Sequence, residues 1–418
     1  MMTLGRVLGI LVAGAVLVSV FGCQKSEETI KIGYIDPLSG PFANVGQHGL
    51  RELQLVVEGI NERGGVLGGT RFEIVSLDGK ANPQESLIAF RQLVDQKVKF
   101  MFQGNSSAVA GALTDAVAKH NDRNPDSAMI YLNYAAVDPA LTNDRCNFWH
   151  FRFDADADMK MQALTNMMAK VPSIKKVYLI NQDYAFGHAV AKAARSMLAV
   201  KRPDIEIVGD DLHPLGKIKD FAPYISKIKA SGADSVITGN WGADLALLVR
   251  AGRDAGLQVD YYSYYAGIVG GPAAIGEAGI DHVKQVTMWH VNAGGEASNA
   301  LVERYRERFP EANDDFFFLT IQHAMELLVQ AIEKTGSTDP LAIARTMEGA
   351  RYEGITGEVW VREDNHQLMQ PLYVSTLKKM GEEGVKYDVE RTGMGPKTDV
   401  RVEAADTYLP TTCEMKRP

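Results

Sequence analysis

Short apolar segments alternate with amphipathic segments of helical period along most of the chain, and this alternation restricts the fold more than any other feature. The first run contains apolar segments at 71–78, 99–103 and 128–133, with helical patterns at 84–98 and 108–120 between them. Strands interleaved with helices of about 10 to 15 residues are typical of parallel sheets built from βαβ units. We therefore expect an α/β fold.

The alternation restarts after Asp158, and this second run predicts a second lobe. A chain of nearly 400 residues also exceeds one compact core. We expect two doubly wound parallel-sheet lobes joined by a multi-strand hinge with a ligand cleft between them, because no Gly-, Ser- or Pro-rich linker separates the runs. The expected boundaries are a signal peptide at 1–22, an N-terminal lobe at 29–152 plus 286–362, and a C-terminal lobe at 153–285 plus 363–413.

The N-terminus carries an apolar segment that is too short to span a membrane. Residues 7–22 are uncharged and lie between Arg6 and Cys23, and a span needs about 20 residues. The length fits the hydrophobic region of a signal peptide. The "VFGC" that ends at Cys23 resembles a bacterial lipobox, so we expect a lipid on Cys23; a plain secretory signal and an uncleaved anchor are the alternatives. Gln24 after the cysteine favours the outer membrane in a double-membraned bacterium.

Charge and cysteine content restrict the partners and the compartment. The net charge is −8, and loss of Arg6 with the signal peptide makes the chain more acidic. We therefore expect no nucleic acid and no anionic lipid surface as partner. A monomer is a separate expectation. Cys146 and Cys413 remain if Cys23 is acylated, which is an even number for an oxidising compartment. A disulfide that pins the C-terminal tail is one hypothesis, and two unrelated buried thiols are the other.

Ligands of open parallel sheets bind at the carboxyl ends of the strands. Asn105, Ser106 and Ser107 follow the apolar segment 99–103 and begin a helical pattern. The serines can cap that helix, and they can also hold a ligand carboxylate together with the free N–H groups of its first turn. The two roles are compatible, and we expect a ligand contact from this loop.

A second loop carries small residues where the segment 128–133 ends. Ala135, Ala136 and Val137 precede the Asp138–Pro139 turn. Small side chains let a ligand approach the backbone carbonyls, although a strand end followed by a proline-forced turn explains the same pattern. We expect these three residues to contact the ligand.

Four aromatic residues lie at the expected strand ends of the second lobe. A scattered aromatic residue more often packs than binds, but several that converge can form an apolar lid or floor for a ligand. Phe186 and Trp241 are the first candidates. The full set is Tyr184, Phe186, Trp241 and Tyr265.

Metal, cofactor and catalytic motifs are not found in the sequence. The acidic run 154–158 lacks the Gly and Glu of an EF-hand loop, because Met159 and Thr165 stand at those positions. An acid-rich helix start explains the run better. The chain has no G-x-S-x-G, H-E-x-x-H or Cys-x-x-Cys pattern. We expect no metal, no cofactor and no enzymatic activity, with an α/β enzyme as the least favoured reading.

The chain resembles a known family over Ile30 to about Leu377. The resemblance is carried by "IGYIDPLSGPFANVGQHGLRELQLVVEGINERGGVLGG" at 32–69, the serine pair at 106–107, "AAVDPALT" at 135–142 and "YAFG" at 184–187. The family is the solute-binding proteins of ABC importers of the branched-chain amino acid type, with the type I periplasmic binding protein fold. The resemblance implies a periplasmic protein that captures a small ligand by hinge closure and docks on an ABC permease and its ATPase.

The amino-acid site of this family is only half retained here. Ser106 matches the serine that holds the ligand carboxylate, and Ala135 matches a backbone position that helps bind the amino group. Val137 replaces an expected threonine and Phe186 an expected tyrosine, while Trp241 keeps an aromatic residue.

The ammonium end of that site is the part that the sequence has lost. The acidic residue expected near 264–267 is missing, because Tyr265 and Ala266 stand there. A buried ammonium without a counter-charge is unfavourable, so an apolar or aromatic acid is the expected ligand. Asp183 or Asp138 could supply the acid, which keeps a branched-chain or other hydrophobic amino acid as the alternative. A ligand sensor that feeds a signalling receptor is the alternative role.

Overall fold

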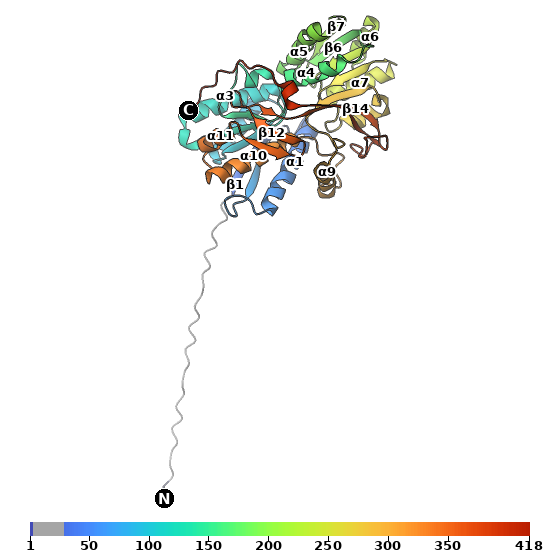
Figure 1. Cartoon of the computed structure of the whole chain (residues 1–418). Helices are drawn as coiled ribbons and strands as arrows, with labels where there is room; N and C mark the ends of the chain where they lie inside the picture. Colours follow the sequence, from blue (N-terminus) through green and yellow to red (C-terminus); the bar gives the residue numbers. More distant parts are fainter. Residues whose placement is uncertain (3–28) are drawn as a thin grey trace.

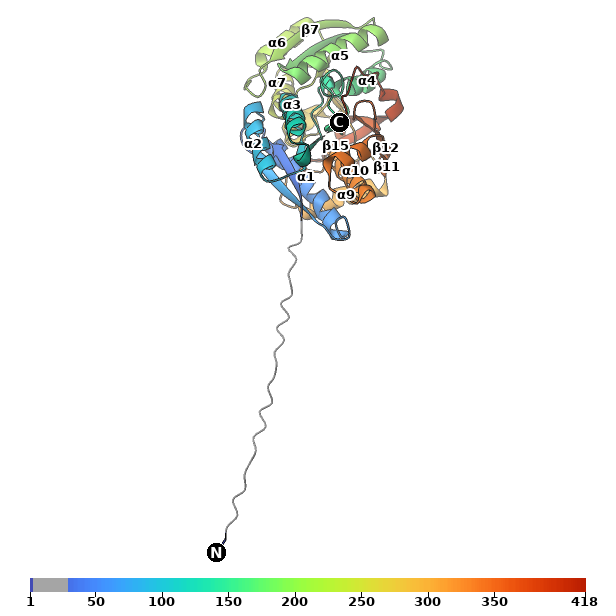
Figure 2. The same ribbon diagram turned by 90° about the vertical axis from the view of Figure 1, so that its left-hand side faces the viewer.

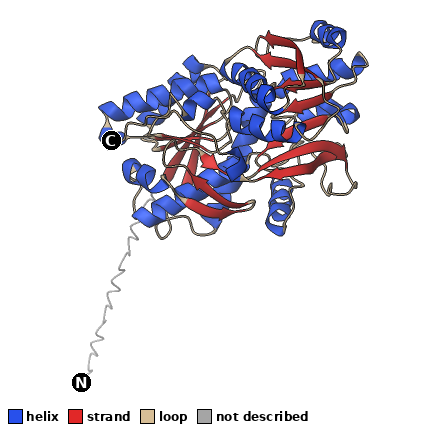
Figure 3. Ribbon diagram, turned by 45° about the horizontal axis from the view of Figure 1, so that its top comes forward, coloured by secondary structure: helices blue, strands red, loops and turns tan. Residues whose placement is uncertain are grey.

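The computed structural model describes residues 1–2 and 29–418, and residues 29–418 form two lobes. One lobe carries the helices labelled α1, α3, α10 and α11, and the other carries α4 to α7 (Figure 1). Figure 2 shows the same two lobes from the side. Each lobe has a central sheet with helices packed around it (Figure 3), which is the expected α/β class.

The sheet of the first lobe has five parallel strands in the order β2-β1-β3-β4-β5. Every residue of β1 except Lys31 is buried, as is typical of a strand with helices on both faces. The strands are β1 (Ile30–Asp36), β2 (Phe72–Asp78), β3 (Phe100–Gln103), β4 (Ile130–Asn133) and β5 (His150–Arg152). The helices are α1 (Ala43–Glu62), α2 (Pro83–Asp95), α3 (Ser107–Arg123), α9 (Glu296–Arg308), α10 (Leu319–Thr335) and α11 (Pro340–Met347).

The sheet of the second lobe has seven strands in the order β15-β14-β10-β9-β8-β6-β7. Its strands are β6 (Lys176–Gln182), β7 (Glu206–His213), β8 (Ser235–Thr238), β9 (Asp260–Ser263), β10 (Val283–Thr287), β14 (Leu372–Lys379) and β15 (Met394–Val402). Its helices are α4 (Ala157–Met168), α5 (Ala185–Lys201), α6 (Ala222–Ser231), α7 (Gly242–Asp254) and α8 (Gly271–Ile275).

The expected parallel sheets are confirmed, and one edge of the second sheet is antiparallel. Strands β14 and β15 pair antiparallel with each other, and β14 pairs antiparallel with β10. The segment between β14 and β15 contains no helix among the described elements, and a parallel crossover needs such a connection. A small antiparallel sheet completes the fold with β11 (Arg351–Gly354), β12 (Gly357–Val361) and β13 (Leu368–Met369).

The chain passes between the two large sheets four times. It crosses after β5 and returns after β10, and it crosses again between β13 and β14 and returns after β15. The last return leads to a disulfide between Cys413 and Cys146. Thr411 donates to the Thr142 carbonyl at 3.0 Å and to Asn143 Oδ1 at 2.9 Å in the same region. The disulfide and these hydrogen bonds thus fix the C-terminal tail to the first lobe. The lobe boundaries given in the sequence analysis stay a prediction.

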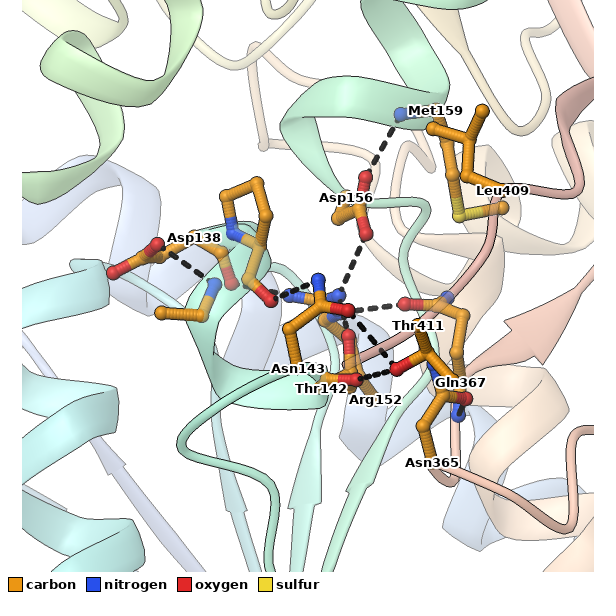
Figure 4. Close-up of polar contacts among 12 residues, drawn as sticks. Asp138, Thr142, Asn143, Arg152, Asp156, Met159, Asn365, Gln367, Leu409 and Thr411 are labelled. Carbon is orange, nitrogen blue, oxygen red and sulfur yellow. Dashed lines mark hydrogen bonds and ion pairs between the residues drawn. The ribbon is translucent and has the colours of Figure 1, made fainter. Parts of the chain in front are cut away.

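Arg152, the last residue of β5, ties the first and third crossings together (Figure 4). Its side chain is fully buried. Its guanidinium donates to Gln367 Oε1 and the Asp138 carbonyl at 2.6 Å each, to Asp156 Oδ2 at 3.0 Å, and to Thr142 Oγ1. One planar cation with several donors therefore holds parts of the hinge that are distant in the sequence.

Candidate functional site

A small cavity lies between the two lobes. Its walls come from the carboxyl ends of β3 and β4 in the first lobe and of β6, β8 and β9 in the second. This is the position expected for a ligand of open parallel sheets. The lining residues are Gly104, Asn105, Ser106, Ser107, Ala135, Ala136, Val137, Tyr184, Phe186, Trp241, Tyr265, Ile268 and Phe318.

The structure brings all ten candidate binding residues of the sequence analysis to this one cavity. Three further lining residues were missed. Gly104 and Ile268 belong to loops that the strand-end rule already marked. Phe318 precedes α10, and no strand end in the sequence pointed to it.

The polar end of the cavity is formed by the start of α3. Ser106 stands at the N-cap with φ of 87°, and its side chain makes no capping hydrogen bond. Ser107 Oγ accepts a hydrogen bond from the Asp138 N–H at 3.2 Å. The capping role considered for the serines is thus not found at Ser106. Its hydroxyl and the N–H groups of the first turn can instead receive an anion.

Asp36, at the end of β1, holds the backbone of the loop between β3 and α3 by hydrogen bonds. Its fully buried carboxylate accepts hydrogen bonds from the N–H groups of Gly104 at 3.2 Å and Asn105 at 2.9 Å. It also accepts one from Tyr134 Oη at 2.7 Å. Burial raises the pKa of Asp36 to about 7, and these hydrogen bonds oppose the rise. Asp36 therefore fixes the backbone that leads into Ser106.

The raised pKa of Asp36 predicts a decrease in stability as the pH rises. The unfolded carboxyl titrates near 3.8 and the folded one near 7, so the folded state binds more protons between these values. The Asp36 contribution is present below the unfolded pKa and is lost as the pH rises through 7, amounting to about 2–3 kcal/mol between pH 5 and pH 8. Urea unfolding at both pH values should show a smaller decrease for Asp36→Asn than for the wild type. An equal decrease in both would contradict the assignment.

Aromatic side chains form the opposite walls. Trp241 Nε1 donates to Tyr184 Oη at 2.8 Å, which fixes the two rings relative to each other. Phe186 meets Tyr265 edge to face with ring centroids 6.0 Å apart. Phe42, in the loop after β1, packs on Trp241 with centroids 4.4 Å apart. The first loop of one lobe therefore touches the aromatic wall of the other, and the two lobes meet over the cavity.

The described residues that line the cavity include no acidic side chain. The Asp183 carboxylate is more than half exposed and pairs with His188 at 2.7 Å. Asp138 Oδ1 accepts from the Ala140 N–H at 3.1 Å and so caps the 3₁₀ turn Pro139–Thr142. Neither of the two carboxylates considered as ammonium partners lies on the cavity wall.

The acidic run 154–158 begins α4. Asp156 is the N-cap residue and accepts from the Met159 N–H at 2.8 Å, which confirms the helix-start interpretation. Within residues 1–2 and 29–418, no group of three or more His, Cys, Asp or Glu side chains is placed to hold a metal ion. None of the helices in the same residues is long and apolar enough to cross a membrane. Cys23 lies outside the described residues.

A family model, a relative in sequence and a solved structure all match this chain over most of its length. Residues 29–382 match the periplasmic binding protein family model. The Leu/Ile/Val-binding protein homolog 4 of Brucella melitensis is 32% identical over 94% of both chains. The crystal structure of the leucine-, isoleucine-, valine-, threonine- and alanine-binding protein from Brucella ovis, in a closed conformation, superimposes with a TM-score of 0.83. It is 29% identical and covers 94% of this chain and 100% of its own.

A more distant neighbour has the same fold with another ligand. The solute-binding protein of an ABC transporter from Rhodopseudomonas palustris, in complex with 3,4-dihydroxybenzoic acid, has a TM-score of 0.77 at 18% identity. It covers 90% of this chain and 98% of its own. The family and these relatives are binding proteins of transporters and not enzymes. The chain therefore belongs to the periplasmic binding protein family, as an extracytoplasmic substrate-binding protein of the ABC transporter type with the type I fold.

Proposed function

We propose that the protein captures a small carboxylate-bearing ligand between its two lobes and delivers it to an ABC importer. The observation that carries the proposal is the two-sided cavity, with Ser106, Ser107 and the start of α3 at one end and aromatic rings on the other walls. The lobes that close are 29–152 plus 286–362 and 153–285 plus 363–413. Contacts from both lobes make a ligand favour the closed state.

The favoured ligand is an apolar or aromatic acid. The described lining residues offer hydroxyl and N–H donors for a carboxylate but no carboxylate for an ammonium group. Transfer of an ammonium from water to such a cavity would be unfavourable. The aromatic acid bound by the Rhodopseudomonas neighbour is compatible with this fold.

A branched-chain or other hydrophobic amino acid is the second candidate ligand. The names of the Brucella relatives, which cover nearly the whole chain, favour it. The role has an alternative too, because a ligand sensor for a signalling receptor would use the same cavity. Permease and ATPase genes next to the gene of this protein would favour the importer.

The proposed partners are an ABC permease and its ATPase in the inner membrane, with the binding protein acting as a monomer. We propose a lipid on Cys23 as the membrane anchor, with the outer membrane as its location in a double-membraned bacterium. Fatty-acid labelling that requires Cys23 would support the anchor.

A thermal-shift screen of residues 24–418 tests the proposed function. The compounds are benzoate, hydroxybenzoates, cinnamates, aliphatic acids, leucine, isoleucine and valine. A ligand that binds only the native state, at about 100 times its Kd, stabilises that state by about 2.7 kcal/mol. We expect stabilisation by aromatic or aliphatic acids. Stabilisation by leucine alone would support the second candidate, and no stabilisation by any of these compounds would contradict carboxylate capture.

Ser106→Ala is expected to weaken binding of the stabilising acid by about 10- to 100-fold. The physical reason is the loss of a hydrogen bond to a charged group, which contributes about 1.5–3 kcal/mol. Isothermal titration calorimetry measures the effect. Ser226→Ala on α6, whose hydroxyl donates to the Ala222 carbonyl at 2.9 Å, is the matched control and should leave Kd unchanged. Equal affinities of the two variants would place the carboxylate elsewhere.

A further inference from the structure

A buried ion pair contacts Tyr265, and neither of its two residues is among those that line the cavity. Lys160 Nζ and Asp154 Oδ2 are 2.7 Å apart, and both side chains have no exposed surface. Tyr265 Oη lies 3.1 Å from the same Asp154 oxygen and 3.3 Å from Lys160 Nζ. Tyr265 thus contacts both the cavity and the ion pair.

The surroundings of Lys160 Nζ are those that any ammonium group needs. Asp154 supplies a carboxylate and Tyr265 a hydroxyl oxygen. The face of the Tyr265 ring lies 4.4 Å from the nitrogen, within the range of a cation–π interaction. The Asp154 carboxylate and the Tyr265 phenol therefore form an ammonium-binding site, and the ammonium group that occupies it is that of Lys160.

Tyr265 also occupies a backbone acceptor of the cavity wall. Its hydroxyl lies 3.2 Å from the Ala135 carbonyl oxygen, and Ala135 lines the cavity. The phenol has one proton, which it shares between this carbonyl and Asp154. A ligand ammonium that approached the Ala135 carbonyl would have to displace that hydroxyl.

The position of Lys160 calls for a specific reason. A fully buried lysine is rare unless it is paired, and a cation in the first turn of a helix is opposed by the helix dipole. The pair has zero net charge wherever its proton sits. It therefore offers no net counter-charge to a second ammonium.

We propose that Lys160 acts as a built-in ammonium group that fills the cation position beside the cavity, and so restricts the ligand to carboxylates without an α-ammonium group. Tyr265 extends this restriction by occupying the Ala135 carbonyl. The inference rests on the proposed function, carboxylate capture, and names the side chain that decides the ligand class.

Removal of Lys160 should open the cation position. In Lys160→Met the Asp154 carboxylate loses its counter-charge, and its Oδ1 already has no hydrogen-bond partner among the described residues. A ligand ammonium can then replace the lost one. We expect the ratio of Kd for an amino acid to Kd for its des-amino analogue to fall by at least about tenfold relative to the wild type.

The experiment is isothermal titration calorimetry with two ligand pairs that differ only in the α-ammonium group. The pairs are L-leucine with 4-methylpentanoate, and L-phenylalanine with 3-phenylpropanoate. A ratio of Kd values cancels a general loss of affinity or stability, so a purely structural role of Lys160 would leave it unchanged. Lys227→Met, whose exposed ammonium pairs with Asp211 at 2.8 Å, is the matched control and should keep the wild-type ratio.

Tyr265→Phe provides a second test should Lys160→Met not fold. It keeps the ring and frees the Ala135 carbonyl, so the ratio should fall in the same direction. Wild-type affinities for the amino acids equal to or higher than those for the des-amino acids would overturn the inference and leave carboxylate capture intact. An unchanged ratio in both variants would also overturn it. A wild type that binds none of the acids in the thermal-shift screen would contradict the proposed function itself.

Discussion

Removal of the Cys146–Cys413 disulfide is expected to lower the free energy of unfolding by about 3–5 kcal/mol. The bond closes a loop with a sequence separation of 267 residues, so it restricts roughly two thirds of the unfolded chain. Its native-state role is to fix the tail that returns from β15 to the first lobe. The change is Cys146→Ser with Cys413→Ser, measured by urea unfolding of residues 24–418.

Reduction of the wild type provides the control for the double substitution. The reduced wild type should be about as unstable as the double variant, while the reductant should leave the variant unchanged. Thiol titration of the unfolded, non-reduced wild type should find no free thiol, because residues 24–418 contain only these two cysteines. Two free thiols, or equal stabilities of wild type and variant, would contradict the account.

Arg152→Met is expected to destabilise the protein by about 3–5 kcal/mol. The substitution keeps an apolar side chain of similar length but leaves the Asp156 carboxylate without its cation. Gln367 Oε1 and the Asp138 carbonyl lose their 2.6 Å hydrogen bonds at the same time (Figure 4). Unsatisfied buried acceptors are unfavourable. Urea unfolding measures the loss.

Arg63→Met on the surface is the matched control for Arg152→Met. Arg63 is more than half exposed and pairs with Glu326 at 2.9 Å. Exposed ion pairs contribute about 0–1 kcal/mol, so the control should lie within that range. Losses of similar size for the two variants would show that the Arg152 hydrogen bonds contribute no more to stability than a surface ion pair.

Much of the fold could be predicted from the sequence, because the strands β1, β3, β4, β6 and β8 are almost wholly buried and read as apolar runs. The strands that were missed have a physical reason in common, which is weak or short apolar patterning. Strand β5 spans only His150–Arg152, and β15 contains Pro396 together with several charged residues. Proline and charge are tolerated in β15 because it lies at the edge of its sheet.

The cavity residues could be predicted because one rule, the carboxyl ends of parallel strands, marks loops that are far apart in sequence. This rule did not predict Phe318, because Phe318 lines the cavity from the start of α10 and not from a strand end. The pairing of Asp154 with Lys160 was hidden as well. The acid-rich helix start explains Asp156. Nothing in the local sequence pattern shows that the Asp154 side chain pairs with Lys160 of α4.

Small-angle X-ray scattering of residues 24–418 tests the central claim most directly, which is that a carboxylate closes the two lobes. The protein is measured alone, with a saturating concentration of the acid that stabilises it most, and with the primary amide of that acid. We predict a smaller radius of gyration with the acid than without ligand, and no change with the amide, because the amide lacks the charge that the start of α3 receives. An unchanged radius of gyration with bound acid, or equal closure by the amide, would contradict the account.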